Sequence, residues 1–272
     1  MTGFQVSKIR ENPLKSKFAA GEAAVGSWLS LCSPVAAEAM APIGWDWLVV
    51  DAQHSPVGFE TMVNCFRAIQ LGGAIPMARV PWLETTWIQR TLDAGALGLV
   101  VPMVNSAEEA RQVVANMKYG PVGIRSSGGS RVSTYIDGEY VRWANENIVV
   151  IVMIETITAA RHAEEIMAVP GVDGCFIGPN DLALSMGLDL GNAGDEIEAV
   201  MQGILKACKN TGKAAGKHCY DAGEISRRIE EGFQFLALAS DSRFMVAEAR
   251  RQFQGIRKGA PAGGLGQKGS LY

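Results

Sequence analysis

The sequence lacks the features that attach a protein to a membrane or to nucleic acid. No apolar run approaches the roughly 20 residues needed to cross a bilayer, and residues 1–16 lack the apolar stretch of a signal peptide. The formal net charge of −3 leaves no excess of basic residues for an anionic lipid surface or a nucleic acid. We therefore expect a soluble cytoplasmic protein with neither a membrane nor a nucleic acid as partner.

Cysteine is sparse, and its spacing has no metal or disulfide pattern. The five cysteines, at positions 32, 65, 175, 208 and 219, are odd in number and form no CxxC pair. Reduced thiols in a cytosolic protein are the simplest interpretation, and a zinc–thiolate site is disfavoured.

The order of the predicted elements indicates an α/β fold, a single (β/α)₈ barrel or TIM barrel. Short apolar runs, such as IVVIVMI, alternate with amphipathic helical patterns from end to end. The predicted strands are residues 24–31, 45–52, 75–80, 98–104, 148–155, 172–178, 213–219 and 235–240. Eight strands with intervening helices predict one barrel domain over residues 1–258, with its active site at the carboxyl ends of the strands.

A doubly wound parallel sheet is the alternative fold. Such a sheet normally has a glycine-rich phosphate-binding turn after its first strand, and residues 29–34, LSLCSP, contain no glycine. The barrel is therefore favoured. Two glycine-rich segments lie outside its pattern: residues 120–138 predict a long loop that is functional or merely mobile, and residues 259–272 predict a disordered tail.

A carboxylate and an imidazole follow the second predicted strand. Asp51 precedes His54 by three residues, a spacing at which a carboxylate can hold the tautomer of an imidazole and raise its basicity. The pair predicts a general base. In the alternative interpretation, Asp51 caps the next helix and His54 is a solvated loop residue.

Arg79 ends the third predicted strand, which is otherwise apolar. A guanidinium group in this position needs a partner, and its fixed geometry suits a carboxylate or a developing enolate oxygen. A structural salt bridge is an equally good interpretation.

Two carboxylates follow neighbouring predicted strands. Glu155 ends the fifth strand, and Asp181 follows the sixth strand in the sequence GPND. Because neighbouring strand ends are close in a barrel, and because a lone buried carboxylate is costly, the pair predicts a site for Mg²⁺ or Mn²⁺. Asp181 has an alternative role as the N-cap of a helix over residues 182–186.

The other histidines and the lysines carry less weight. His162 is expected on a solvated helix surface, whereas His218, at the end of the seventh strand, is either a site residue or a loop residue without chemistry. A Schiff-base mechanism would need a lysine in the site, and Lys217 is the only near candidate. The sequence therefore favours metal chemistry.

Taken in order, these residues resemble the HpcH/HpaI family of class II 2-keto-acid aldolases. That family includes 4-hydroxy-2-oxoheptanedioate aldolase, 2-keto-3-deoxy-sugar-acid aldolases and macrophomate synthase. The resemblance covers residues 24–250 and implies a barrel of the phosphoenolpyruvate/pyruvate type. It rests on GSWLSLCSPVAAEAMAPIGWDWLVVDAQHSP, ARVPW, LDAGALGLVVPMVNSAEEA, the GIR loop, MIET and GVDGCFIGPNDLALSMG.

The resemblance implies a lyase that cleaves or forms 4-hydroxy-2-oxo acids through the enolate of pyruvate, with an aldehyde or another electrophile as acceptor. Glu155 and Asp181 match the family's ligands for a divalent metal (Mg²⁺ or Mn²⁺, with Co²⁺ as a further candidate), and no other cofactor is expected. His54 and Asp51 match its catalytic pair, and Arg79 matches its substrate-gripping arginine. Further substrate contacts are expected from Trp28, Met153, Gly178, Pro179, Asn180, Asp181 and His218.

Three positions depart from the family pattern. Gln53 stands where the family usually has Glu, and Met153 stands where it usually has Gln two residues before the metal-binding Glu. His218 lies at a strand exit where apolar residues are expected. Because positions 153 and 155 lie on the same face of a strand, we expect an unusual acceptor and a retained metal site.

Other functions stay open at this point. The same enolate could serve oxaloacetate decarboxylation or addition to a non-aldehyde acceptor, and the chain could be a non-catalytic binding relative. Cleavage of an acyl-CoA is a weaker alternative, because no basic cluster for the CoA phosphates stands out. The resemblance also implies a homohexamer, a trimer of dimers that exchange C-terminal helices, for which residues 243–256 are the candidate.

Overall fold

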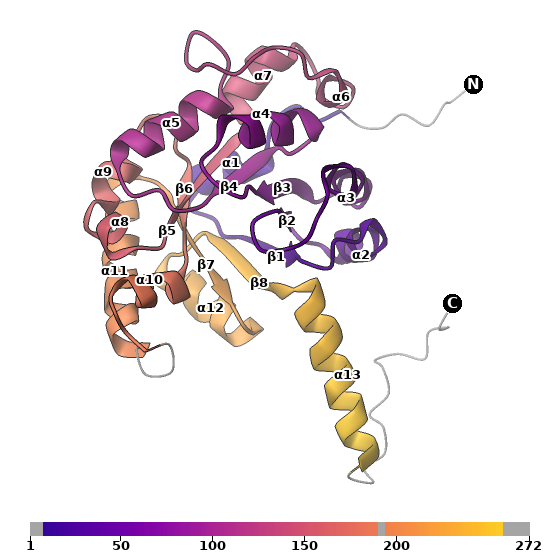
Figure 1. Cartoon of the computed structure of the whole chain (residues 1–272), viewed down its shortest axis with the longest axis vertical. Helices are drawn as coiled ribbons and strands as arrows, with labels where there is room; N and C mark the ends of the chain where they lie inside the picture. The colour runs from indigo at the N-terminus through magenta and orange to yellow at the C-terminus, as the bar shows by residue number, and fades with distance from the viewer. Residues whose placement is uncertain (1–7, 190–193, 258–272) are drawn as a thin grey trace.

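The chain forms a closed barrel of eight parallel strands in the computed structural model, which describes residues 8–189 and 194–257 (Figure 1). Each strand pairs with the next one in the sequence, and β1 closes the barrel against β8. The strands are β1 (Ala24–Leu29), β2 (Trp47–Asp51), β3 (Ile75–Arg79), β4 (Gly98–Val101), β5 (Val149–Ile154), β6 (Gly174–Ile177), β7 (Ala214–Cys219) and β8 (Phe235–Ser240). The predicted (β/α)₈ barrel is confirmed.

Helices surround the barrel, so the strands are buried on both faces and their sequences are apolar almost throughout (Figure 1). They are α1 (Pro13–Ala19), α2 (Pro34–Met40), the 3₁₀ helix η1 (Ala41–Ile43), α3 (Phe59–Leu71), α4 (Thr85–Ala94), α5 (Ala107–Met117), α6 (Ser130–Ser133), α7 (Tyr140–Asn147), α8 (Ile157–Arg161), α9 (Ala163–Met167), α10 (Pro179–Ser185), α11 (Gly194–Thr211), α12 (Ala222–Glu231) and α13 (Asp241–Arg257).

A column of aromatic rings fills the barrel interior. Trp47 stacks on Phe235 with ring centroids 4.2 Å apart, Phe235 meets Phe176 at 6.0 Å, and Phe176 meets Trp28 at 5.4 Å. Gly26 makes room for this column, because a Cβ at that position would lie 2.2 Å from the Trp47 ring. The barrel is thus closed below, and Trp28 forms part of the floor of the cavity above it.

The long segment over residues 120–138 packs on the outside of the barrel. It contains α6, and its Arg125 is buried, with Nη2 2.7 Å from the Asp93 carboxylate of α4 and the guanidinium 4.5 Å from the Tyr119 ring centroid. None of its described residues lines the cavity at the carboxyl ends of the strands. The contacts of Arg125 therefore fix the segment against the helix layer, away from that cavity.

The last helix, α13, projects away from the barrel (yellow in Figure 1) and carries exposed apolar side chains, among them Met245, Val246 and Ile256. The predicted tail over residues 259–272 lies outside the described residues. Within the described ranges, none of the helices has the length and apolar character needed to span a bilayer. The cysteines are free thiols, as expected.

Candidate active site

A cavity of about 310 Å³ lies at the carboxyl ends of the strands, where a barrel places its active site. It brings together every predicted site residue except Glu155, which lies directly beneath its wall. The cavity is lined by Trp28, Ser30, Asp51, His54, Arg79, Met153, Phe176, Ile177, Gly178, Pro179, Asn180, Asp181, His218 and Ser240.

A larger cavity, about 710 Å³, lies at the amino-terminal end of β3, between α3 and α6. Its lining includes Arg67, Gln70, Arg131 and Tyr135, but none of the described lining residues is an aspartate, a glutamate or a histidine. Volume alone would select this cavity, whereas the chemistry of the side chains selects the smaller one.

Asp51 and Arg79 form a two-point ion pair across the paired ends of β2 and β3. Arg79 Nε lies 2.9 Å from Asp51 Oδ1, and Nη2 lies 2.7 Å from Oδ2. Burial raises the pKa of Asp51, but the hydrogen bonds and positive charge of Arg79, together with the N–H groups of Gln53 and His54, outweigh burial and lower the pKa overall. The guanidinium also lies over the Trp28 ring, 4.5 Å from its centroid, so its position is fixed from two sides.

The Asp51 carboxylate binds the backbone of the turn that carries His54. Its Oδ1 accepts hydrogen bonds from the N–H groups of Gln53 and His54, at 3.1 and 3.3 Å. The described contacts of this carboxylate are therefore with Arg79 and the turn, not with the imidazole as the sequence led us to expect. The alternative role as a helix cap is wrong, because α3 begins at Phe59 after Gly58.

Glu155 follows β5 directly and is 2% exposed. Its Oε1 accepts a hydrogen bond of 2.7 Å from the N–H of Met103, a residue held at φ 57° in the left-handed region that non-glycine residues rarely adopt. Gly178 lies against the carboxylate, since a Cβ there would come within 2.7 Å of Oε2. Burial raises the pKa of Glu155, and the negative charge of Asp181 raises it further, against the N–H of Met103 and the charge of Arg79.

Asp181 lies in the first turn of α10, which begins at Pro179 with Gly178 as its N-cap. The predicted helix start was therefore three residues too late, and Asp181 is not the N-cap. Its side chain is exposed at the cavity and close enough to Glu155 to raise the pKa of that group.

The two carboxylates fit a hard divalent cation. A buried carboxylate whose pKa is raised by a second carboxylate is relieved by a cation placed between them. Among the described residues, no three His, Cys, Asp or Glu side chains gather as a complete metal cage. An ion held here would take its other ligands from water and substrate, which suits Mg²⁺ or Mn²⁺ better than structural zinc.

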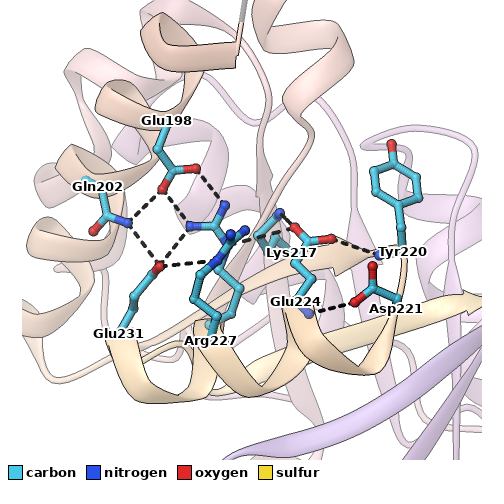
Figure 2. Close-up of polar contacts among 9 residues, drawn as sticks. Glu198, Gln202, Lys217, Tyr220, Asp221, Glu224, Arg227 and Glu231 are labelled. Atoms are coloured by element: carbon cyan, nitrogen blue, oxygen red, sulfur yellow. Dashed lines mark hydrogen bonds and ion pairs between the residues drawn. The ribbon is translucent and has the colours of Figure 1, made fainter.

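His218 and Lys217 point to opposite sides of β7. The His218 imidazole lines the cavity, and burial, followed by the charge of Arg243, lowers its pKa to about 4. Lys217 is buried outside the barrel, where its Nζ pairs with Glu224 of α12 (Figure 2). A Schiff base at Lys217 would therefore form away from the cavity. His162 lies on the surface 3.3 Å from Glu165, as expected.

Sequence reasoning missed four residues that line the cavity. Ser30 and Ser240 follow or end the first and eighth strands, so the search of strand exits would have found them if it had included hydroxyl groups. Phe176 and Ile177 were hidden within the apolar body of β6.

The profile of the HpcH/HpaI aldolase/citrate lyase family matches residues 24–247. The chain belongs to this family. A hydroxypyruvate/pyruvate aldolase from Roseovarius nubinhibens is 38% identical over 245 residues, which cover 89% of this chain and 95% of the relative. A 4-hydroxy-2-oxo-heptane-1,7-dioate aldolase from Klebsiella pneumoniae is 36% identical over 241 residues, covering 88% of this chain and 91% of the relative.

Solved structures of the HpcH/HpaI family agree with this assignment. A family member from Burkholderia cenocepacia superposes with a TM-score of 0.84 at 33% identity, covering 90% of this chain and 99% of that one. The curated relatives are lyases that act on 2-oxo acids, which is the class of enzyme that the sequence predicts. The predicted family and reaction class are therefore confirmed.

Proposed function

We propose that this HpcH/HpaI family member is a divalent-metal-dependent aldolase that forms and cleaves 4-hydroxy-2-oxo acids, with pyruvate or hydroxypyruvate as the nucleophilic partner. The observation that carries the proposal is Glu155, a buried carboxylate whose pKa is raised beside Asp181 at the wall of the strand-end cavity. The activities for which the relatives are named support the same donor substrates.

Glu155 and Asp181 would hold the metal, with Mg²⁺, Mn²⁺ and Co²⁺ as the candidates. A cation bound there would acidify the carbon next to the carbonyl group of the 2-oxo acid. Gly178 lets the Glu155 carboxylate lie directly behind the cavity wall, because a Cβ at position 178 would come within 2.7 Å of Oε2.

Arg79 is placed to stabilise the negative charge that develops on the substrate. Its bonds to Asp51 use Nε and Nη2, which leaves Nη1 for an enolate oxygen. Because the carboxylate of Asp51 and the ring of Trp28 fix the guanidinium beforehand, it needs little reorganisation during the reaction. This assigns Asp51 the role of positioning both Arg79 and the turn that bears His54.

His54 is the group that moves the proton. It accepts a proton from the donor carbon, and the new carbon–carbon bond forms between that carbon and the carbonyl carbon of the aldehyde. The aldehyde oxygen gains a proton, and retro-aldol cleavage runs through the same steps in reverse. We assign contact with the substrates to Trp28, Met153, Gly178, Pro179, Asn180 and His218, which line the cavity.

Exchange of the pyruvate methyl protons tests this function without knowledge of the acceptor. Metal-stripped protein is incubated with pyruvate in D₂O, Mg²⁺, Mn²⁺ or Co²⁺ is added, and the methyl signal is followed by NMR. Metal-dependent loss of the signal is the expected result. Measurable metal binding without exchange, for all three metals, would overturn the proposal.

We further propose that the protein works in the cytoplasm as a homo-oligomer in which α13 contacts a second subunit. Met245, Val246 and Ile256 of this helix are 55%, 48% and 72% exposed, an arrangement typical of a helix that packs against a partner. Light scattering coupled to gel filtration should give a mass of several subunits, six if the family assembly holds. A monomer at micromolar concentration would contradict this part of the proposal.

A further inference from the structure

A cationic side chain, Arg243, follows β8 three residues after Ser240, a residue that lines the cavity, and itself faces a surface hollow along α13. Arg243 belongs to the first turn of α13, and its backbone N–H lies 3.3 Å from Oγ of Ser240, which lines the cavity. Its guanidinium carbon lies 4.7 Å from the centroid of the Tyr220 ring. The positive charge of Arg243 is also close enough to His218 to lower the pKa of that imidazole.

Arg243 differs from the other cations near His218 in having no carboxylate partner. Arg79 pairs with Asp51, and Lys217 pairs with Glu224. No carboxylate among residues 8–189 and 194–257 forms a salt bridge with Arg243. Glu155 and Asp181 thus make one side of the cavity anionic, whereas Arg243 has no ion-pair partner among the described residues. The nearby Asp241 carboxylate accepts hydrogen bonds from Ser30 and Leu31 instead.

The Tyr220 ring, on which the Arg243 guanidinium rests, belongs to a residue whose backbone is bonded to α12. The backbone N–H of Tyr220 lies 2.9 Å from Oε2 of Glu224, whose other oxygen pairs with Lys217 (Figure 2). The Tyr220 ring extends away from this cluster (Figure 2), and Arg243 lies against it. A guanidinium supported in this way loses little freedom when it binds a ligand.

We propose that Arg243 binds a carboxylate group at the far end of the acceptor, so that the enzyme prefers anionic aldehydes to neutral aldehydes of the same length. The inference rests on the proposed aldolase function. It follows from the arrangement of charges, because the donor 2-oxo acid is assigned to Glu155, Asp181 and Arg79. Arg243 lies over the Tyr220 ring, whose centroid is 5.7 Å from that of the cavity-lining His218. His218, a neutral imidazole at neutral pH, offers a hydrogen bond to the same acceptor.

Paired acceptors test the role of Arg243. The ratio of kcat/KM for glyoxylate over glycolaldehyde, and for succinic semialdehyde over butanal, is measured in the wild type, Arg243→Gln and Arg243→Lys. Arg243→Gln should lower the ratio for at least one pair by about 10- to 100-fold, as expected for loss of a charged hydrogen bond. Arg243→Lys should retain part of the preference. Arg250→Gln, a neutralised arginine farther along the exposed face of α13, should leave both ratios unchanged.

Two outcomes would overturn the inference: a wild-type enzyme that does not prefer the anionic member of either pair, or an Arg243→Gln variant that loses activity equally with both members. Failure of the proposed function is recognised separately, by the absence of metal-dependent pyruvate exchange in the wild type. In that case the ratio of Kd for 2-oxoadipate over 2-oxohexanoate, measured on the metal-loaded protein, decides the role of Arg243. An unchanged ratio in Arg243→Gln would reject it.

Discussion

Two clusters of charged residues, one between the barrel and its helices and one at the strand-end cavity, are built on opposite principles. In the cluster between β7, α11 and α12, each acid faces a base: Arg228 lies 2.5 Å from Glu198 and 2.8 Å from Glu231, and Lys217 pairs with Glu224 (Figure 2). Beneath the cavity wall, Glu155 is buried beside a second carboxylate, that of Asp181.

The pKa values report the same difference. The hydrogen bonds of Arg228 hold the pKa of Glu198 at about 2, whereas burial and the charge of Asp181 raise the pKa of Glu155. A carboxylate that is satisfied within the protein stabilises the fold. A carboxylate left with a raised pKa is available for a ligand, and this contrast distinguishes the site from the structural network.

The largest expected effect is on activity at the unsatisfied carboxylate. Glu155→Gln keeps the size of the side chain but removes a charge that the metal requires, so pyruvate exchange should fall at least about 1000-fold. Glu198→Gln, in the paired cluster, should retain exchange at the wild-type level. NMR rates for both variants at saturating Mn²⁺ make the comparison, and comparable losses would mean that the two clusters do not differ in function.

A second comparison contrasts two exposed histidines. His54→Ala should lower the exchange rate by about 100- to 10 000-fold, because proton transfer loses its assigned base. His162→Ala, on the outer surface beside Glu165, is the matched control and should have no effect. If His54→Ala exchanges pyruvate normally, another group moves the proton and the assignment is wrong.

In the paired cluster the expected effect is on stability. Glu224→Gln leaves Lys217, which is 4% exposed, without its counter-ion, so the free energy of unfolding should fall by about 3 kcal/mol. Glu146→Gln removes a partner from the exposed pair with Arg142 and should change stability by less than about 0.5 kcal/mol. Urea denaturation of the three proteins measures both values, and equal changes would show that burial of the pair does not matter.

The smallest expected effect is a gain in thermal stability when the charge of Glu155 is removed, whereas removal of a paired charge usually lowers stability. A carboxyl group whose pKa is raised on folding binds protons more tightly in the folded state, so its contribution to stability falls as the pH rises through the window between the unfolded and folded pKa values. Glu155→Gln should therefore raise the Tm of the metal-free protein at pH 8, on the order of 2 °C. The gain should shrink at pH 5. Asp51, with its lowered pKa, is present in both proteins and cancels from the difference.

Excess metal should reverse this order of Tm values, because only the wild type gains stability from binding. Scanning calorimetry with and without Mn²⁺ measures it. A lower Tm for metal-free Glu155→Gln at pH 8 would contradict the description of Glu155 as an unsatisfied group.

The fold could be predicted because the residues of each strand indicate whether that strand is buried on one face or on both. Residues 148–154 are apolar throughout, which indicates a strand covered on both sides, and the polar residues that follow such strands marked the cavity. The residues at which the helices begin and end were harder to predict. The start of α10 was placed too late, although Pro179 is favoured at a first helical position.

The sequence predicted which residues belong to the site better than it predicted which of them contact each other. Asp51 and Arg79 meet because β2 and β3 pair with these residues in register, and sequence spacing suggested His54 instead. The hydrogen bond from Met103 to Glu155 depends on a left-handed backbone conformation that no glycine or asparagine announces. Such contacts arise from tertiary packing, which local patterns do not encode.

Gly178 has a practical consequence for attempts to redesign the enzyme. The space next to the Glu155 carboxylate exists only because this residue has no side chain, so even alanine would intrude at 2.7 Å from Oε2. A mutant library that varies the cavity wall should therefore keep position 178 constant. Substitutions are better placed at and after β7 and β8, around His218 and Arg243, where the side chains do not contact the Glu155 carboxylate.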